Sequence, residues 1–168
     1  MKKLYKYLLL ITISLSVSCS NTDKAVENGL DKINSDATLS LQVNSIDSEQ
    51  VVVDLYLNTK EVNKPRMVEL FFEISDNFKL KSSEPLHAIT AADKNLTVQS
   101  DEQGQVRTVI LSTMNTNTID SGSLVRYTFS YDGGSGEIKF VDRRPVFAPL
   151  DADRGLTFGE SLSLGGVK

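Results

Sequence analysis

Few side chains in this chain of 168 residues combine into a pattern that could perform chemistry. The single histidine, His87, follows Pro85-Leu86, and no nucleophile or acid stands beside it in the sequence. Glu69 and Glu73 point the same way on one predicted strand, so they could act as paired carboxylates. A solvated strand face explains these two residues better. We therefore expect no catalytic residue and no enzymatic activity.

Two segments near the C-terminus carry weaker patterns. Gly159-Glu160-Ser161-Leu162-Ser163 places a serine as a nucleophile elbow does, but the second glycine and the strand-to-helix setting are missing, so we expect a terminal strand. Asp151 and Asp153 alternate in a loop, as the ligands of calcium loops do. The later acidic ligand of an EF-hand is absent, and an Asp-rich turn explains the same residues. We expect no cofactor, with calcium at Asp151 and Asp153 as the alternative.

The N-terminal segment is typical of an export signal. Residues 1–18 begin with lysines, continue with an apolar run over residues 7–17 and end in small residues before Cys19. The apolar run is far shorter than the roughly 20 residues that a bilayer-spanning helix needs. Residues 19–36 are polar and rich in Asn, Asp and Ser, which indicates a tether ahead of the folded domain.

The residues around the only cysteine make the predicted location more specific. Leu15-Ser16-Val17-Ser18-Cys19 resembles a bacterial lipoprotein signal, with Ser16 where that family usually has leucine. The resemblance implies that Cys19 becomes the mature N-terminus and carries the lipid, which would hold the protein at the cell envelope. The residue after the cysteine is Ser20, not the Asp that retains many such proteins on the inner membrane, and this favours the outer membrane in a Gram-negative cell. The alternative is an ordinary signal cleaved nearby, with Cys19 incidental.

Charge and composition exclude several functions. The formal charge is −4, and removing Lys2, Lys3 and Lys6 with the signal leaves 15 basic against 22 acidic residues, or −7. A negative domain without a basic cluster is a poor partner for nucleic acid. One cysteine forms no internal disulfide, and one histidine supplies no multi-histidine metal site.

From Ala37 to the C-terminus the sequence follows the period of two that half-buried strands show. Apolar residues alternate with polar ones over residues 39–43, 51–57, 68–74 and 125–131, and turn signals such as 101–104 and 132–136 separate the runs. We predict eight or nine short strands without a long helix, which favours an antiparallel β-sandwich over residues 37–168.

Two stretches of this domain resemble cohesin domains. Residues 67–76, MVELFFEISD, are similar to the third cohesin strand, and residues 118–129, TIDSGSLVRYTF, are similar to a later cohesin loop and strand. Cohesins usually turn after that third strand through a Tyr-Asp-Pro segment, where this chain has Ser75-Asp76-Asn77. The resemblance implies a jelly-roll sandwich, a fold that several carbohydrate-binding modules share. One fold serves many functions, so the partner does not follow from it.

The candidate partner face is the side of the predicted strand that carries Phe71. The alternation places Met67, Glu69, Phe71 and Glu73 together, opposite the apolar positions 68, 70, 72 and 74. An aromatic side chain with a polar rim suits protein contact, and the cohesin resemblance implies that this sheet faces the dockerin. We expect a protein partner, with a polysaccharide as the alternative. Because the chain has no tryptophan, platforms for stacking sugars are scarce.

Overall fold

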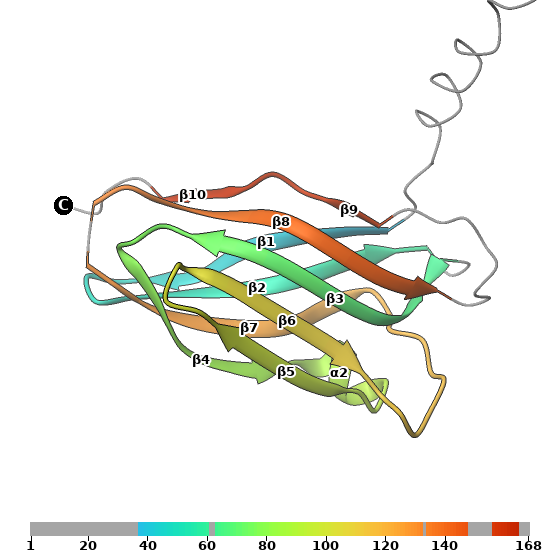
Figure 1. Ribbon diagram of the computed structural model, residues 1–168. Helices are drawn as coiled ribbons and strands as arrows, with labels where there is room; N and C mark the ends of the chain where they lie inside the picture. Colours follow the sequence, from blue (N-terminus) through green and yellow to red (C-terminus); the bar gives the residue numbers. More distant parts are fainter. Residues whose placement is uncertain (1–36, 61–62, 133, 148–155, 165–168) are drawn as a thin grey trace, which may run out of the picture. The chain divides into compact units, whose positions relative to one another are not determined.

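The computed structural model describes residues 37–60, 63–132, 134–147 and 156–164. These residues form two stacked sheets and one short helix, α2 (His87–Ala91), as Figure 1 shows. The strands are β1 (Ala37–Ile46), β2 (Gln50–Thr59), β3 (Pro65–Ile74), β4 (Phe78–Pro85), β5 (Asn95–Ser100), β6 (Gln105–Leu111), β7 (Gly122–Tyr131), β8 (Gly136–Phe147), β9 (Leu156–Phe158) and β10 (Leu162–Leu164).

The predicted β-sandwich is confirmed. One sheet has the order β4-β7-β2-β1-β9 and the other has the order β10-β8-β3-β6-β5. The strands pair in antiparallel fashion except β1 and β9, which run parallel over Ala37–Leu39 and Leu156–Phe158. The described residues hold ten strands, against the eight or nine predicted, because β9 and β10 are separate strands of three residues each.

The terminal strand predicted at Gly159–Ser163 is partly wrong. Residues 159–161 lie outside any strand and carry the chain from β9 in one sheet to β10 in the other. The N–H of Gly159 donates to the carbonyl of Leu39 at 2.7 Å, which holds this crossover against β1. A Cβ at position 159 would lie 3.3 Å from that carbonyl oxygen, so the close approach favours glycine. Glu160 and Ser161 are exposed.

The core lies between the two sheets, where the apolar rows meet as the alternation predicts. The row of β2 is fully buried at positions 51, 53, 55 and 57, and the row of β3 is buried at positions 68, 70, 72 and 74. Five aromatic rings fill the centre, with Phe72 edge-on to Tyr127 and Phe129, and Phe78 stacked on Tyr131. The hydroxyl of the buried Tyr127 shares a hydrogen bond of 2.8 Å with Thr108 Oγ1, so this polar group has a partner in the core.

The turn predicted at residues 101–104 is confirmed, and it joins β5 to β6 as a hairpin. The Asp101 carboxylate accepts hydrogen bonds from the backbone N–H of Gln103 at 3.0 Å and of Gln105 at 2.8 Å. Gly104 has φ +78°, and a Cβ there would lie 2.7 Å from the carbonyl oxygen of Ile74. This turn therefore needs glycine both for its backbone angle and for its contact with β3.

Several sequence predictions lie outside the described residues. They are the signal at residues 1–18, the tether at residues 19–36, lipid attachment at Cys19 and the calcium candidates Asp151 and Asp153. Within the described part of the chain, the helix is too short to cross a bilayer.

Candidate functional site

The predicted partner residues lie on the outer face of the β10-β8-β3-β6-β5 sheet. Register sets Glu69 of β3 between Val109 of β6 and Arg144 of β8, and it sets Phe71 opposite Arg107 of β6. Because side chains of directly paired residues share one side of a sheet, these groups project together. We call this surface the Phe71 face and define it by seven residues: Met67, Glu69, Phe71, Glu73, Arg107, Val109 and Arg144.

Glu69 is the residue of this face whose position differs most from expectation. The sequence pattern favours a solvated carboxylate, but Glu69 is only 6% exposed. Arg107 Nε donates to its Oε1 at 2.8 Å, and Arg107 Nη2 lies 2.6 Å from the same oxygen. Arg144 Nη1 approaches Oε2 at 3.6 Å from the other side. Two guanidinium groups thus cover this carboxylate, which anchors them in return.

Phe71 is half-buried and lies between the same two arginines. The guanidinium carbon of Arg107 lies 5.9 Å from the centre of the ring, and that of Arg144 lies 5.5 Å from it. Both distances fall in the range of cation–π attraction. The Glu69 carboxylate therefore holds both arginines beside the ring, so contacts within the domain already link the four side chains at the centre of the Phe71 face.

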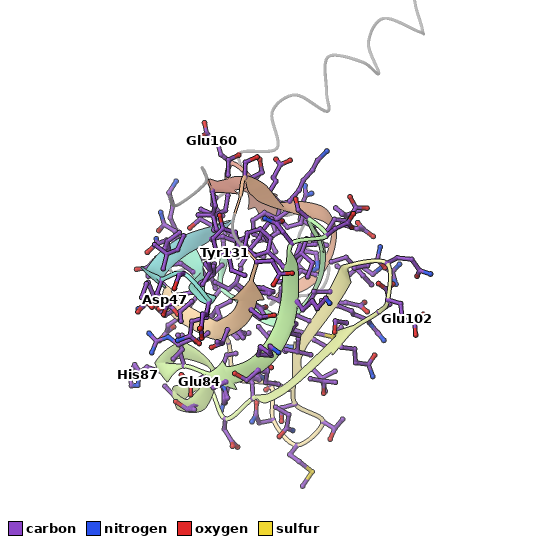
Figure 2. All side chains as sticks on the ribbon, turned by 90° about the vertical axis from the view of Figure 1, so that its left-hand side faces the viewer. Asp47, Glu84, His87, Glu102, Tyr131 and Glu160 are labelled. Atoms are coloured by element: carbon purple, nitrogen blue, oxygen red, sulfur yellow. The ribbon has the colours of Figure 1, made fainter. Side chains whose placement is uncertain are left out.

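The arrangement does not resemble a catalytic pair of acids. Glu69 is buried under two arginines, whereas Glu73 is exposed. Four residues along a strand separate their Cα atoms by about 13 Å, beyond the roughly 5–10 Å between the carboxyl groups of a glycosidase. His87 begins α2 and is exposed, and Figure 2 shows it pointing outward, well separated from Glu160, the neighbour of Ser161. The structure therefore brings no two of the sequence-predicted catalytic candidates together.

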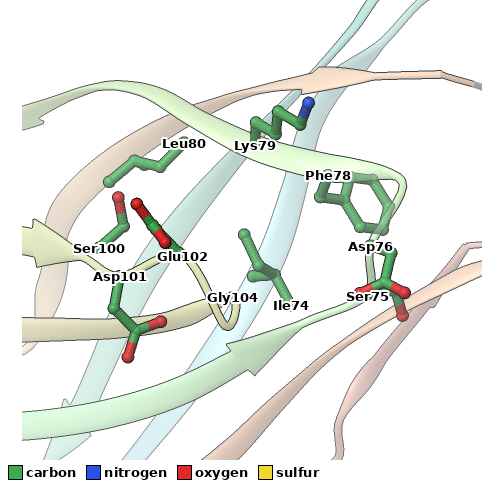
Figure 3. Close-up of a pocket in the computed structure, with 10 residues that line it drawn as sticks. All are labelled: Ile74, Ser75, Asp76, Phe78, Lys79, Leu80, Ser100, Asp101, Glu102 and Gly104. Atoms are coloured by element: carbon green, nitrogen blue, oxygen red, sulfur yellow. The ribbon is translucent and has the colours of Figure 1, made fainter.

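A groove of about 310 Å³ opens at the end of the sandwich between two turns. Ile74, Phe78 and Leu80 form its apolar part, and Figure 3 shows that Asp76 comes from one turn and Asp101 and Glu102 from the other. The Asp101 carboxylate is already engaged by backbone N–H groups of its own turn. Over the part of the chain that the structure describes, no three His, Cys, Asp or Glu side chains gather as metal ligands would.

Sequence reasoning missed the two arginines of the Phe71 face. Arg107 and Arg144 stand far from Glu69 along the chain, and only strand pairing brings them to it. The available signal was parity, that is, the alternation of odd and even positions between the two faces of a strand. Arg107 occupies an outward position between the buried Val106 and Thr108. Parity assigns a side chain to a face of its sheet, but it does not identify the neighbouring strand.

Comparison with known proteins rests on structure alone, since no family model and no curated protein matches this sequence. The sixth cohesin of scaffoldin B from Acetivibrio cellulolyticus, solved with a mutant Cel5 dockerin, superposes with a TM-score of 0.64 at 13% identity. The match covers 78% of this chain and 99% of that one. The fold is cohesin-like.

Two further structures support this assignment of the cohesin-like fold. The cohesin of the Coh-OlpC–Doc435 complex from Clostridium thermocellum has a TM-score of 0.60 at 12% identity, covering 75% of this chain and 91% of its own. A non-cellulosomal cohesin from the archaeon Archaeoglobus fulgidus has a TM-score of 0.56 at 10% identity, covering 76% and 89%. At such low sequence identity, the structural similarity supports the fold and says nothing about which residues form a site.

Proposed function

We propose that the cohesin-like domain binds another protein through the Phe71 face and performs no catalysis. The observation that carries this proposal is the half-buried Phe71 ring held between two arginines that a single buried carboxylate anchors. Two of the similar structures named above are cohesins in complex with dockerins, which supports a protein partner. The sheet is formed before binding, so association orders few groups and loses little affinity to that cost.

The chemistry of the Phe71 face favours a protein over a polysaccharide. Aromatic and arginine side chains at the centre of a patch are the residues that dominate protein–protein affinity. Val109 and Met67 are half-buried beside them and add apolar surface, while Glu73 is exposed at the rim. Sugars stack on open aromatic faces, whereas guanidinium groups lie over this ring. A protein is therefore the better-supported partner.

Photo-crosslinking in living cells tests the face directly. A benzoylphenylalanine residue replaces Phe71 in the full chain, and the matched control carries it at Tyr56, which is half-buried on the other sheet. We expect discrete protein adducts at position 71 that the control lacks. Identical adduct patterns at the two positions would contradict the proposal.

Once the partner is isolated, Phe71→Ala measures how much the ring contributes. We expect the dissociation constant to rise by at least about tenfold, since a central interface aromatic commonly contributes about 2 kcal/mol or more. Tyr56→Ala serves as the control and should leave affinity within about twofold. Glu69→Lys is unsuitable as a binding test, because it places a third cation beside Arg107 and Arg144 and disturbs the face itself.

We also propose that the chain is exported and held at the bacterial envelope by lipid on Cys19. The support is the sequence of residues 1–18 and the cysteine that follows them. Two or more acyl chains give stable anchorage where one gives only weak binding. A lipid anchor of this kind would confine the Phe71 face to the neighbourhood of the membrane, where it meets other envelope proteins.

The lipid proposal predicts a change of fraction for Cys19→Ala. We expect the wild-type chain in the membrane pellet and most of the variant in the supernatant after high-speed centrifugation, because the variant lacks the sulfur that carries the acyl chains. Metabolic labelling with an alkyne fatty acid should mark the wild type alone. Equal distribution of the two proteins, with neither labelled, would rule out the anchor.

A further inference from the structure

Among the described strands, β5 is the edge most open to pairing with a further strand. The edges of the two sheets are β4, β9, β10 and β5. β9 and β10 have three residues each, and β4 carries two lysines, a register shift between Leu80 and Ser82, and a terminal Pro85. β5, with the sequence NLTVQS, has six residues, no charge, no proline and an unbroken register with β6. Native proteins normally protect such edges against pairing.

Two hydrogen bonds set which backbone groups of β5 point away from the sheet. The N–H of Asp101 donates to the carbonyl of Gln105 at 3.0 Å, and the carbonyl of Gly104 accepts from the N–H of Ile74 of β3 at 2.9 Å. Odd-numbered residues of β5 therefore bond to β6, because the direction alternates along an antiparallel pair. The N–H and C=O groups of Leu96, Val98 and Ser100 consequently point outward from the sheet edge.

We propose that this edge pairs with the β5 strand of a second copy of the same chain, around a two-fold axis at Val98. This register pairs Val98 with Val98 and Leu96 with Ser100, so the outward N–H and C=O groups of all three residues find partners. A two-fold pairing closes on itself, which limits the assembly at this edge to a dimer.

Charge and apolar surface both suit the second copy. The paired segment Asn95–Ser100 carries no charged residue in either copy, so no like charges come together along the shared edge. Leu96 and Val98 pack against the core only in part, as does Leu80 of the neighbouring β4. Pairing the two edges would cover these three side chains in both copies. Lys79 on β4 is exposed and discourages the other sheet from pairing in the same way.

The proposed dimer has a consequence for binding. An axis perpendicular to a continuous sheet keeps the outer faces of both copies on the same side, so two Phe71 faces would point in one direction. A partner with two binding sites would then bind the dimer more tightly than it binds a single copy, without any new contact. This consequence depends on the proposed function, whereas the dimer itself does not.

Disulfide trapping tests the register. Val98→Cys and Thr97→Cys are each made in a full chain that also carries Cys19→Ala, so that the introduced thiol is the only one. Val98 faces its own copy across the axis at a Cα separation of about 5.5 Å, which a disulfide can bridge. The two copies of Thr97 are offset by two residues and lie about 8 Å apart, beyond that reach. Under copper-phenanthroline oxidation we expect the Val98→Cys variant to form its disulfide dimer at least tenfold faster than the Thr97→Cys variant.

The Thr97→Cys variant is a demanding control because Thr97 is the more exposed of the two residues. Random collision would crosslink a thiol at position 97 faster than one at position 98, so a faster or equal rate at position 97 overturns the proposal. Absence of crosslinking at both positions also overturns it.

Sedimentation of the Cys19→Ala chain, which has the wild-type edge, gives a second and independent readout. Ser100→Pro, made in that chain, removes one outward N–H and leaves the β5–β6 ladder intact, since the N–H of Ser100 does not bond to β6. We expect the Cys19→Ala chain to dimerise and Ser100→Pro to raise its dissociation constant at least tenfold. Phe71→Ala should leave dimerisation unchanged, which separates this edge from the proposed partner face. A Cys19→Ala chain that stays monomeric up to about 1 mM, or a dimer indifferent to Ser100→Pro, contradicts edge pairing.

Discussion

Replacing Phe72 by alanine is expected to lower the free energy of unfolding by about 3–5 kcal/mol. Phe72 is fully buried, and its ring meets Tyr127 at 5.2 Å and Phe129 at 6.5 Å between centroids, both edge-on. The substitution removes apolar burial and leaves a cavity that the two facing sheets cannot collapse to fill. Urea unfolding followed by tyrosine fluorescence measures the loss.

The neighbouring Phe71 supplies the matched control, since it is the same residue type on the opposite side of the same strand. Phe71→Ala should cost less than about 1 kcal/mol, because the ring is half-buried on the outer face and leaves no enclosed cavity. If the two variants lose the same free energy of unfolding, the outer ring supports the fold. That result would contradict the interpretation of the Phe71 face as a binding surface.

The second large effect is expected at Asp54, a carboxylate of β2 that is only 9% exposed on the outer side of its sheet. Arg126 Nε donates to its Oδ1 at 2.8 Å and Arg126 Nη2 donates to its Oδ2 at 2.9 Å. Asp54→Asn removes the charge from this bidentate pair, and we expect a loss of about 2 kcal/mol of unfolding free energy at pH 7. Denaturant titration measures the loss.

This loss should depend on pH in a defined direction. The hydrogen bonds from Arg126 lower the pKa of Asp54 below its usual value. The folded state therefore holds this proton more weakly than the unfolded chain does, and the carboxylate contributes its full stability above the unfolded pKa of about 4. That contribution fades as the pH falls from about 4 through the lowered folded pKa. The difference between the wild type and Asp54→Asn should shrink over this interval.

Glu84 provides the control for Asp54 because it approaches the same arginine. Its Oε1 lies 3.7 Å from Arg126 Nη1, but its side chain is 61% exposed. Water screens such a pair, so Glu84→Gln should cost about 0.5 kcal/mol or less. If Glu84→Gln costs as much as Asp54→Asn, burial is not what makes the Asp54 pair strong.

Much of the fold was predictable because a half-buried strand repeats every two residues. The inward rows of β2, β3 and β7 follow directly from that alternation, and the turn at residues 101–104 follows from its Asp and Gly. These features depend on neighbouring residues, whose faces the strand geometry assigns locally. The short helix α2 was missed because five residues are too few to show a helical repeat, and the crossover at residues 159–161 was missed because Gly159, Glu160 and Ser161 supply no apolar side chain to a pattern.

The sequence alone determined which side of its strand Phe71 occupies, and it determined the inward place of Phe72. Only the tertiary structure decided what surrounds each ring. Glu69 is buried because register brings Arg107 and Arg144 over it, and Asp54 is buried because register brings Arg126 to it. Parity is a property of the single strand, whereas strand order and register depend on which segments pair across the whole domain. The neighbours that give a polar residue its role are therefore set by that pairing.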